Sequence, residues 1–174
     1  MLGVGILDRV VEIFIKEGVK LLKENHEFSR LQEAISEKIA RELRFNAELL
    51  DAILRNKNSK NQEFISALTE SLKTTAFDSL SDSSLPLTLF FGESEIQSED
   101  WLTIHEKFPY PSKNYVKWAS TINNPSALIE RIYHRTKIIK LFSLINISKN
   151  QQSIKYVLFL IKAHRQGIGS LIKR

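Results

Sequence analysis

The stretch FSRLQEAISEKIARELRFNAELLDAILR, residues 28–55, carries the clearest structural signal in the chain. Its main apolar residues recur at steps of three or four. They are Ile35, Ile39, Leu43, Ala47, Leu50 and Leu54. An α-helix completes one turn in 3.6 residues, so this spacing places all of them on one face. Residues 28–55 are therefore predicted to form a long helix that buries one side.

Asn46 interrupts this apolar face between Leu43 and Leu50. A buried asparagine in helical packing can specify register or partner choice at a cost in stability. If Asn46 has that role, Asn46→Leu should raise thermal stability and make the oligomeric state or the choice of partner less specific. Alternatively, Asn46 lies at the edge of the seam and reaches water. The first alternative makes Asn46 a candidate residue for register or partner specificity.

Further helical patterns flank this stretch on both sides. Residues 4–23 carry a wide apolar stripe. Residues 62–77 place Phe64, Leu68, Leu72 and Ala76 on one line, which predicts one continuous helix. Asn124-Pro125 is a strong helix start signal, and the helix that follows should reach about residue 145.

The last predicted helix starts near Asn150 and is apolar almost all round. Its heptad-like seam consists of Ile154, Val157, Ile161, His164, Ile168 and Leu171. Six consecutive apolar residues, 156–161, lie within it. Such a helix is either central in its own bundle or shared with a partner. Gly167 and Gly169 are expected to end or loosen it.

Residues 78–112 differ from both flanks because serine, proline and acidic residues are frequent there. Residues 85–91 fit either a buried strand or one helical turn, and short helices are expected in the rest. The prediction is one all-α domain, residues 1–174, forming a bundle of about five main helices. It divides into an acidic helical part (1–77), an irregular segment (78–112) and a basic helical part (113–174).

Charge is distributed unevenly along the chain. Residues 1–106 hold 12 basic and 19 acidic residues, a net charge of −7. Residues 107–174 hold 13 basic residues and one acidic residue, Glu130, a net charge of +12. This asymmetry indicates either an acidic partner, such as nucleic acid, or two parts of the fold that neutralise each other.

The basic part supplies the candidate residues for nucleic acid or another acidic partner. They are Arg131, Arg135, Lys137, Lys140, Lys155, Lys162, Arg165, Lys173 and Arg174. Lys155, Lys162 and Lys173 project in nearly the same direction, because steps of seven and eleven are close to whole helical turns. They fit a stripe of phosphate contacts, or solvated lysines at the edge of a buried helix.

Catalytic motifs are missing from the sequence. It has no cysteine, no phosphate-binding loop, and no histidine pair at the spacing of a helical zinc site, so no cofactor or metal is expected. The lack of cysteine and of a secretory leader favours a cytoplasmic location. An enzyme of unfamiliar type remains an open alternative.

The leading hypothesis is a non-catalytic helical adaptor or regulatory subunit that docks on a protein partner or self-associates. It depends on the excess of apolar residues in the first and last helices. The alternative is a nucleic-acid-binding protein that uses residues 107–174. A further alternative is peripheral membrane association through the N-terminal amphipathic helix, which its balanced acidic and basic residues disfavour.

Overall fold

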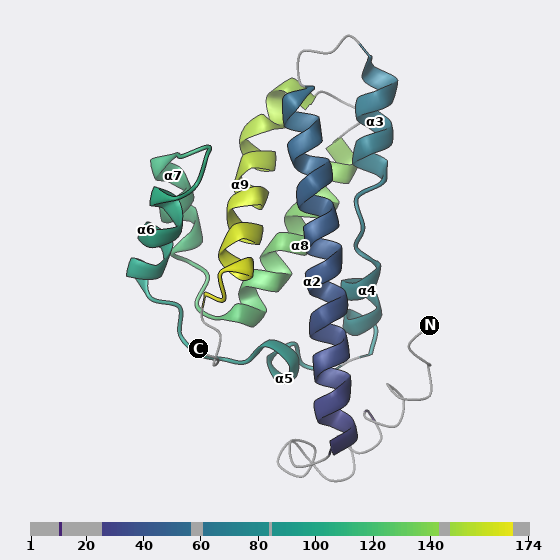
Figure 1. Cartoon of the computed structure of the whole chain (residues 1–174), viewed down its shortest axis with the longest axis vertical. Helices are drawn as coiled ribbons and strands as arrows, with labels where there is room; N and C mark the ends of the chain where they lie inside the picture. Colours follow the sequence, from purple (N-terminus) through teal and green to yellow (C-terminus); the bar gives the residue numbers. More distant parts are fainter. Residues whose placement is uncertain (1–10, 12–25, 57–60, 84, 143–146, 169–174) are drawn as a thin grey trace.

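The computed structural model describes residues 11, 26–56, 61–83, 85–142 and 147–168 (Figure 1). These residues form an all-α bundle without strands, which confirms the predicted fold class. The helices are α2 (His26–Arg55), α3 (Gln62–Glu70), α4 (Thr75–Ser81), α5 (Thr88–Phe91), α6 (Ser98–Glu106), α7 (Lys113–Ala119), α8 (Pro125–Phe142) and α9 (Ile147–Arg165). Apart from Val11, the helix predicted over residues 4–23 lies outside the described residues.

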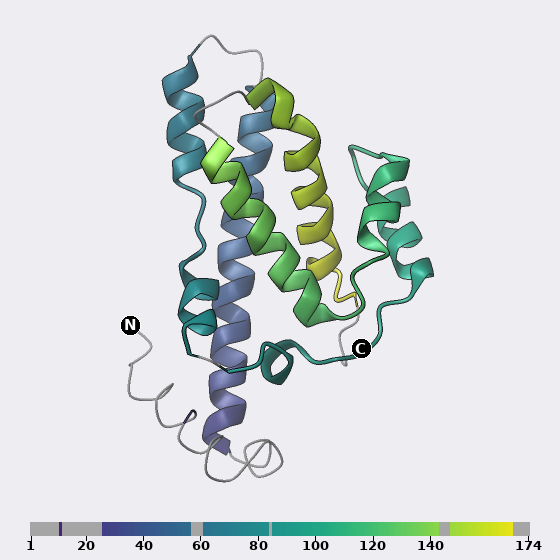
Figure 2. The same cartoon turned by 180° about the vertical axis from the view of Figure 1, so that it is seen from behind.

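Two long helices organise the bundle. Helix α2, which is 30 residues long, contains the stretch 28–55 whose apolar spacing predicted it. Its residues Ile39, Leu43 and Leu50 are fully buried on one face. Helices α3 and α4 flank α2 on one side, while α9 packs along its other side (Figure 1). Helix α8 lies obliquely against α9, and α6 and α7 cover the remaining side of α9 (Figure 2).

The all-round apolar pattern of α9 is explained by its central position. Residues 156–161 are all buried, at 8% exposure or less, against α2, α6, α7 and α8. This run, on which the expectation of self-association depended, is therefore covered within a single chain. His164 is half-buried, and burial lowers its pKa to about 4. The helix ends before Gly167, which adopts a positive φ of 72°.

Helix α8 begins where Asn124-Pro125 predicted it. The side-chain oxygen of Asn124 accepts a hydrogen bond from the backbone N–H of Ala127, 2.9 Å away. This bond satisfies one of the N–H groups that lack a partner in the first helical turn.

Asn124→Ala should therefore lower the free energy of unfolding by about 1 kcal/mol. The adjacent exposed Asn123 provides the control, because its backbone carbonyl, rather than its side chain, accepts a hydrogen bond from the Ile96 N–H. Urea denaturation of both variants measures the difference. Equal stability of Asn124→Ala and Asn123→Ala would show that the cap is not formed.

The segment 78–112 contains short helices, as expected. Within residues 85–91, Thr88–Phe91 form a helical turn, α5, and no strand is present. The side chain of Gln32 donates a hydrogen bond to the Leu89 carbonyl, 2.8 Å away, which ties this turn to α2. Trp101 and Ile104 of α6 are almost completely buried. The irregular segment therefore contributes to the core.

One continuous helix over residues 62–77 was a wrong prediction. Helix α3 ends at Glu70, and α4 begins at Thr75 after a non-helical link. Polar side chains from distant helices bind the backbone around this link. Asn46 pairs with Lys73, and the Glu42 carboxylate accepts the N–H of Ala76, 3.0 Å away. These bonds replace helical hydrogen bonds that the sequence pattern alone would favour.

The break also changes which residues face the core. Ile65 and Thr69 are buried on α3, whereas Phe64 is 44% exposed. The predicted apolar line through Phe64 and Leu68 therefore does not describe the buried face. Within the described ranges, no helix is long and apolar enough to cross a membrane.

Candidate functional site

The predicted basic residues do not gather on one surface. Lys137 of α8 pairs with Asp78 of α4, and Lys140 of α8 binds the α3–α4 link. Lys155 and Lys162 of α9 contact residues 107–110. Arg165 lies at the edge of a groove between α2 and α9. Arg131 and Arg135 line a separate pocket, and residues 173–174 are outside the described residues. Each group therefore has a different structural setting.

Lys137 and Lys140 are engaged within the chain. The Lys137 Nζ lies 2.6 Å from the Asp78 Oδ1, and the Lys140 Nζ donates to the Leu72 carbonyl at 2.6 Å. Burial raises the pKa of Asp78, but hydrogen bonds from Lys137 and Thr74 outweigh burial and leave the pKa below its usual value. Internal neutralisation therefore accounts for part of the charge asymmetry.

Asn46 is fully buried, and both ends of its amide are satisfied. The Nδ2 group donates to the Lys73 carbonyl at 2.6 Å, and the Lys73 N–H donates to Oδ1 at 2.7 Å. Its interaction within the chain is thus with the α3–α4 link. A role for Asn46 in partner choice stays a prediction.

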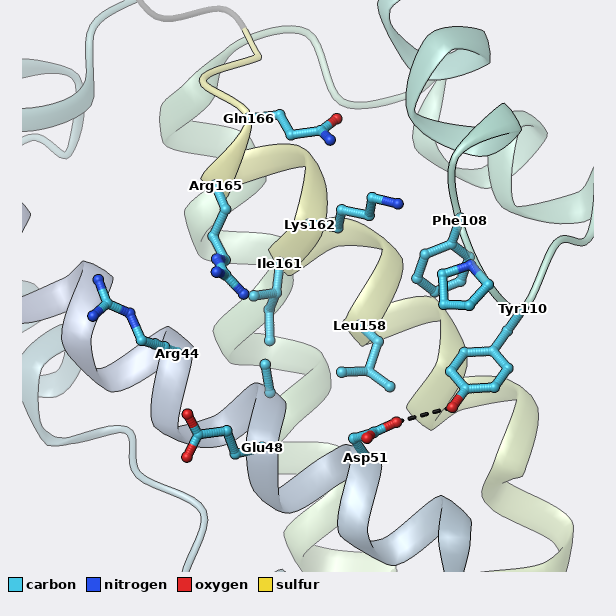
Figure 3. A pocket seen from close by; sticks show the side chains of 12 residues that line it. Arg44, Glu48, Asp51, Phe108, Tyr110, Leu158, Ile161, Lys162, Arg165 and Gln166 are labelled. Carbon is cyan, nitrogen blue, oxygen red and sulfur yellow. Dashed lines mark hydrogen bonds between the residues drawn. The ribbon is translucent and has the colours of Figure 1, made fainter.

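A groove of about 580 Å³ lies between α2, α9 and residues 108–110 (Figure 3). We call it the α2–α9 groove. Its floor is apolar and is formed by Ala47, Phe108, Leu158 and Ile161. Its rim is polar and includes Arg44 and Glu48 of α2 and Arg165 of α9. An apolar floor with a few polar groups at the edge is typical of binding sites.

The wall of the groove, residues 107–110, is held by both neighbouring helices. The Tyr110 hydroxyl donates to the Asp51 Oδ1 of α2 at 2.9 Å, and this bond, with burial, raises the pKa of Tyr110. The Lys155 Nζ lies 5.5 Å from the centre of the Tyr110 ring. The Lys162 ammonium donates to the Lys107 carbonyl, and burial lowers its pKa. The groove is therefore preformed.

Asp51 is fully engaged at this wall, since it also pairs with Arg55. Arg44, Glu48 and Arg165 differ, because no salt bridge within the described part of the chain involves them. All three are exposed, and Arg44 and Arg165 come from the two helices that flank the groove (Figure 3). The charges available to a ligand are thus two cations and one carboxylate.

A second cavity of about 430 Å³, the α7–α9 pocket, lies between α7, α8 and α9. Lys117, Trp118, Arg131, Arg135 and Tyr156 line it, together with two hydroxyl side chains. The sequence singled out the two arginines and missed the α7 residues. The adjacent basic and aromatic residues at 117–118 are the signal that could have found them.

Among the described residues, no group of three or more His, Asp or Glu side chains is placed to hold a metal ion. No protein-family model, curated protein or solved structure matches the chain. Function must therefore be inferred from the two cavities and the groups that line them.

Proposed function

We propose that this protein is a non-catalytic interaction module that docks a short segment of a partner protein in the α2–α9 groove. The observation that supports this proposal is the shape and lining of the groove. It has an apolar floor, a wall held in place by hydrogen bonds of Tyr110 and Lys162, and exposed charges at its rim. Its volume of about 580 Å³ lies within the roughly 300–1,000 Å³ typical of ligand sites. It therefore has room for a few side chains.

Charge complementarity specifies the partner segment. Arg44 and Arg165 are the exposed cations of the rim, and Glu48 is its exposed carboxylate. A segment with an apolar anchor and neighbouring acidic residues would place the anchor against Ala47 and Tyr110, which are half-buried at the groove. Its carboxylates would pair with the two arginines, whose planar guanidinium groups bind carboxylates in a bidentate manner.

A partner protein fits this groove better than a second copy through α9. The apolar run of α9 that favoured self-association is buried within the chain. A groove that combines an apolar floor with a charged rim is also typical of transient interfaces rather than obligate ones. Homo-oligomer formation stays a prediction that light scattering can test.

Panning a library of displayed 12-residue peptides on the full chain tests the proposal. We expect enrichment of peptides that combine large apolar residues with Asp or Glu. Arg44→Glu/Arg165→Glu should weaken binding of the enriched peptides at least tenfold, because two attractive contacts become repulsive. Fluorescence anisotropy with labelled peptides measures the change.

The matched control is Arg30→Glu/Arg41→Glu, which makes the same reversal at exposed positions of α2 outside the groove. It should bind the peptides like the original protein. The proposal fails if no peptide is enriched, or if both double variants bind the enriched peptides equally. It also fails if the enriched peptides are basic.

A further inference from the structure

The α7–α9 pocket is lined by three basic residues and by no acidic residue. Lys117, Arg131 and Arg135 come from two different helices and line the same cavity. No carboxylate lines this pocket, and no salt bridge within the described ranges involves these three cations. Like charges gathered around a concave surface focus a positive potential there, which favours an anionic ligand.

Aromatic rings form the other part of the lining. Trp118 is 39% exposed at the pocket, and its ring meets the Tyr156 ring edge to face at 5.3 Å between centroids. The guanidinium carbon of Arg135 lies 5.8 Å from the centre of the Tyr156 ring. The Tyr156 ring attracts the Arg135 guanidinium through a cation–π interaction, and Trp118 keeps an exposed surface for a ligand.

The Tyr156 hydroxyl is a buried polar group beside this pocket. The residue is only 1% exposed, and its hydroxyl has no hydrogen-bond partner among the described residues. Leaving a buried polar group unpaired is unfavourable. Burial raises the pKa of Tyr156 despite the charges of Arg131 and Arg135, so the hydroxyl is a proton donor at neutral pH.

We infer that the α7–α9 pocket binds a nucleotide unit of a single-stranded nucleic acid. Arg131, Arg135 and Lys117 contact its phosphate, and the adjoining base stacks on Trp118. The net charge of the whole chain, +5, favours approach of the rest of the strand.

The aromatic surface favours a single strand over other polyanions. Bases of a duplex are stacked on one another, so they are not free to stack on Trp118, whereas single-strand proteins combine cations with aromatic platforms. A carboxylate-rich peptide would satisfy the arginines but has no base for the ring. The groove between α2 and α9 is not involved, so this inference is independent of the proposed function.

The test measures binding of fluorescent 12-nucleotide oligo(dT) to the full chain at about 50 mM salt and upward. We expect binding that weakens with salt. Arg131→Gln/Arg135→Gln should weaken binding at least tenfold and reduce the salt slope by about 0.7 at most, the value for one lost phosphate contact on a single strand. Trp118→Ala should weaken it about tenfold, the scale of one lost stacking contact.

Arg30→Gln/Lys38→Gln, two exposed cations of α2, is the matched control and should bind like the original protein. Circular dichroism of each variant verifies that the helices are intact. Absence of oligo(dT) binding at 50 mM salt would overturn the inference, as would equal binding by the two double variants. Tighter binding of a 12-base-pair duplex, or of phosphatidylserine vesicles, would also overturn it.

Discussion

Asn46→Leu is expected to lower the free energy of unfolding by about 2–4 kcal/mol. Leucine has the same number and branching of side-chain heavy atoms, but it cannot accept from the Lys73 N–H or donate to the Lys73 carbonyl. Each buried polar group left without a partner costs about 1–3 kcal/mol, which outweighs the extra apolar burial. The sign is therefore opposite to the one expected from the sequence pattern.

Urea denaturation followed by circular dichroism measures this loss. Asn114→Leu is the control, because it makes the same chemical change at an exposed position of α7 and should stay within about 0.5 kcal/mol of the original protein. If Asn46→Leu is as stable as the original protein, or more stable, the hydrogen bonds to Lys73 do not stabilise the α3–α4 link.

Phe159→Ala should have a still larger effect, about 3–5 kcal/mol, because it leaves a cavity at the centre of the aromatic core. The Phe159 ring is fully buried. Its centroid lies 5.4 Å from that of Phe108, 5.8 Å from that of Tyr115 and 6.0 Å from that of Trp101. It thus joins α6, α7 and the groove wall to α9.

Denaturation followed by tryptophan fluorescence is the suitable measurement, since Trp101 is only 1% exposed beside Phe159. Phe64→Ala removes the same side chain at a 44% exposed position of α3 and is the matched control. We expect it to cost less than about 1 kcal/mol. Equal losses for the two variants would contradict the assignment of Phe159 to the central core.

The long helices could be predicted because their signals are local. The apolar steps of residues 28–55 and the Asn124-Pro125 start signal depend only on neighbours in the sequence. Both agree with α2 and α8. The end of α9 before Gly167 agrees for the same reason, since glycine readily adopts positive φ.

The break between α3 and α4 has no local signal. Leu72 and Ala76 continue the helical spacing, and both are buried as that spacing predicts. The bonds that stabilise the link come from Asn46, Glu42 and Lys140, which are 27, 34 and 68 residues away from their partners. Contacts at such separations follow from the packing of α2 and α8 and not from periodicity.

The candidate sites, like the fold, could be predicted from the sequence only in part. The sequence identified Arg131, Arg135 and Arg165 as members of a basic set. It could not show that Lys117 joins the two arginines, because α7 reaches them only by packing on α9. Nor could it show that Lys155 and Lys162 contact the aromatic residues at 108 and 110.

Titration of the ¹⁵N-labelled protein with the best peptide from panning tests the proposed function most directly. Nuclear magnetic resonance then reports which backbone amides change their environment. Docking in the α2–α9 groove predicts saturable shifts at Arg44, Glu48, Tyr110 and Arg165, with little change at Trp118 in the other pocket. Shifts centred on Trp118 and Arg131, with none along the groove, would contradict the proposal.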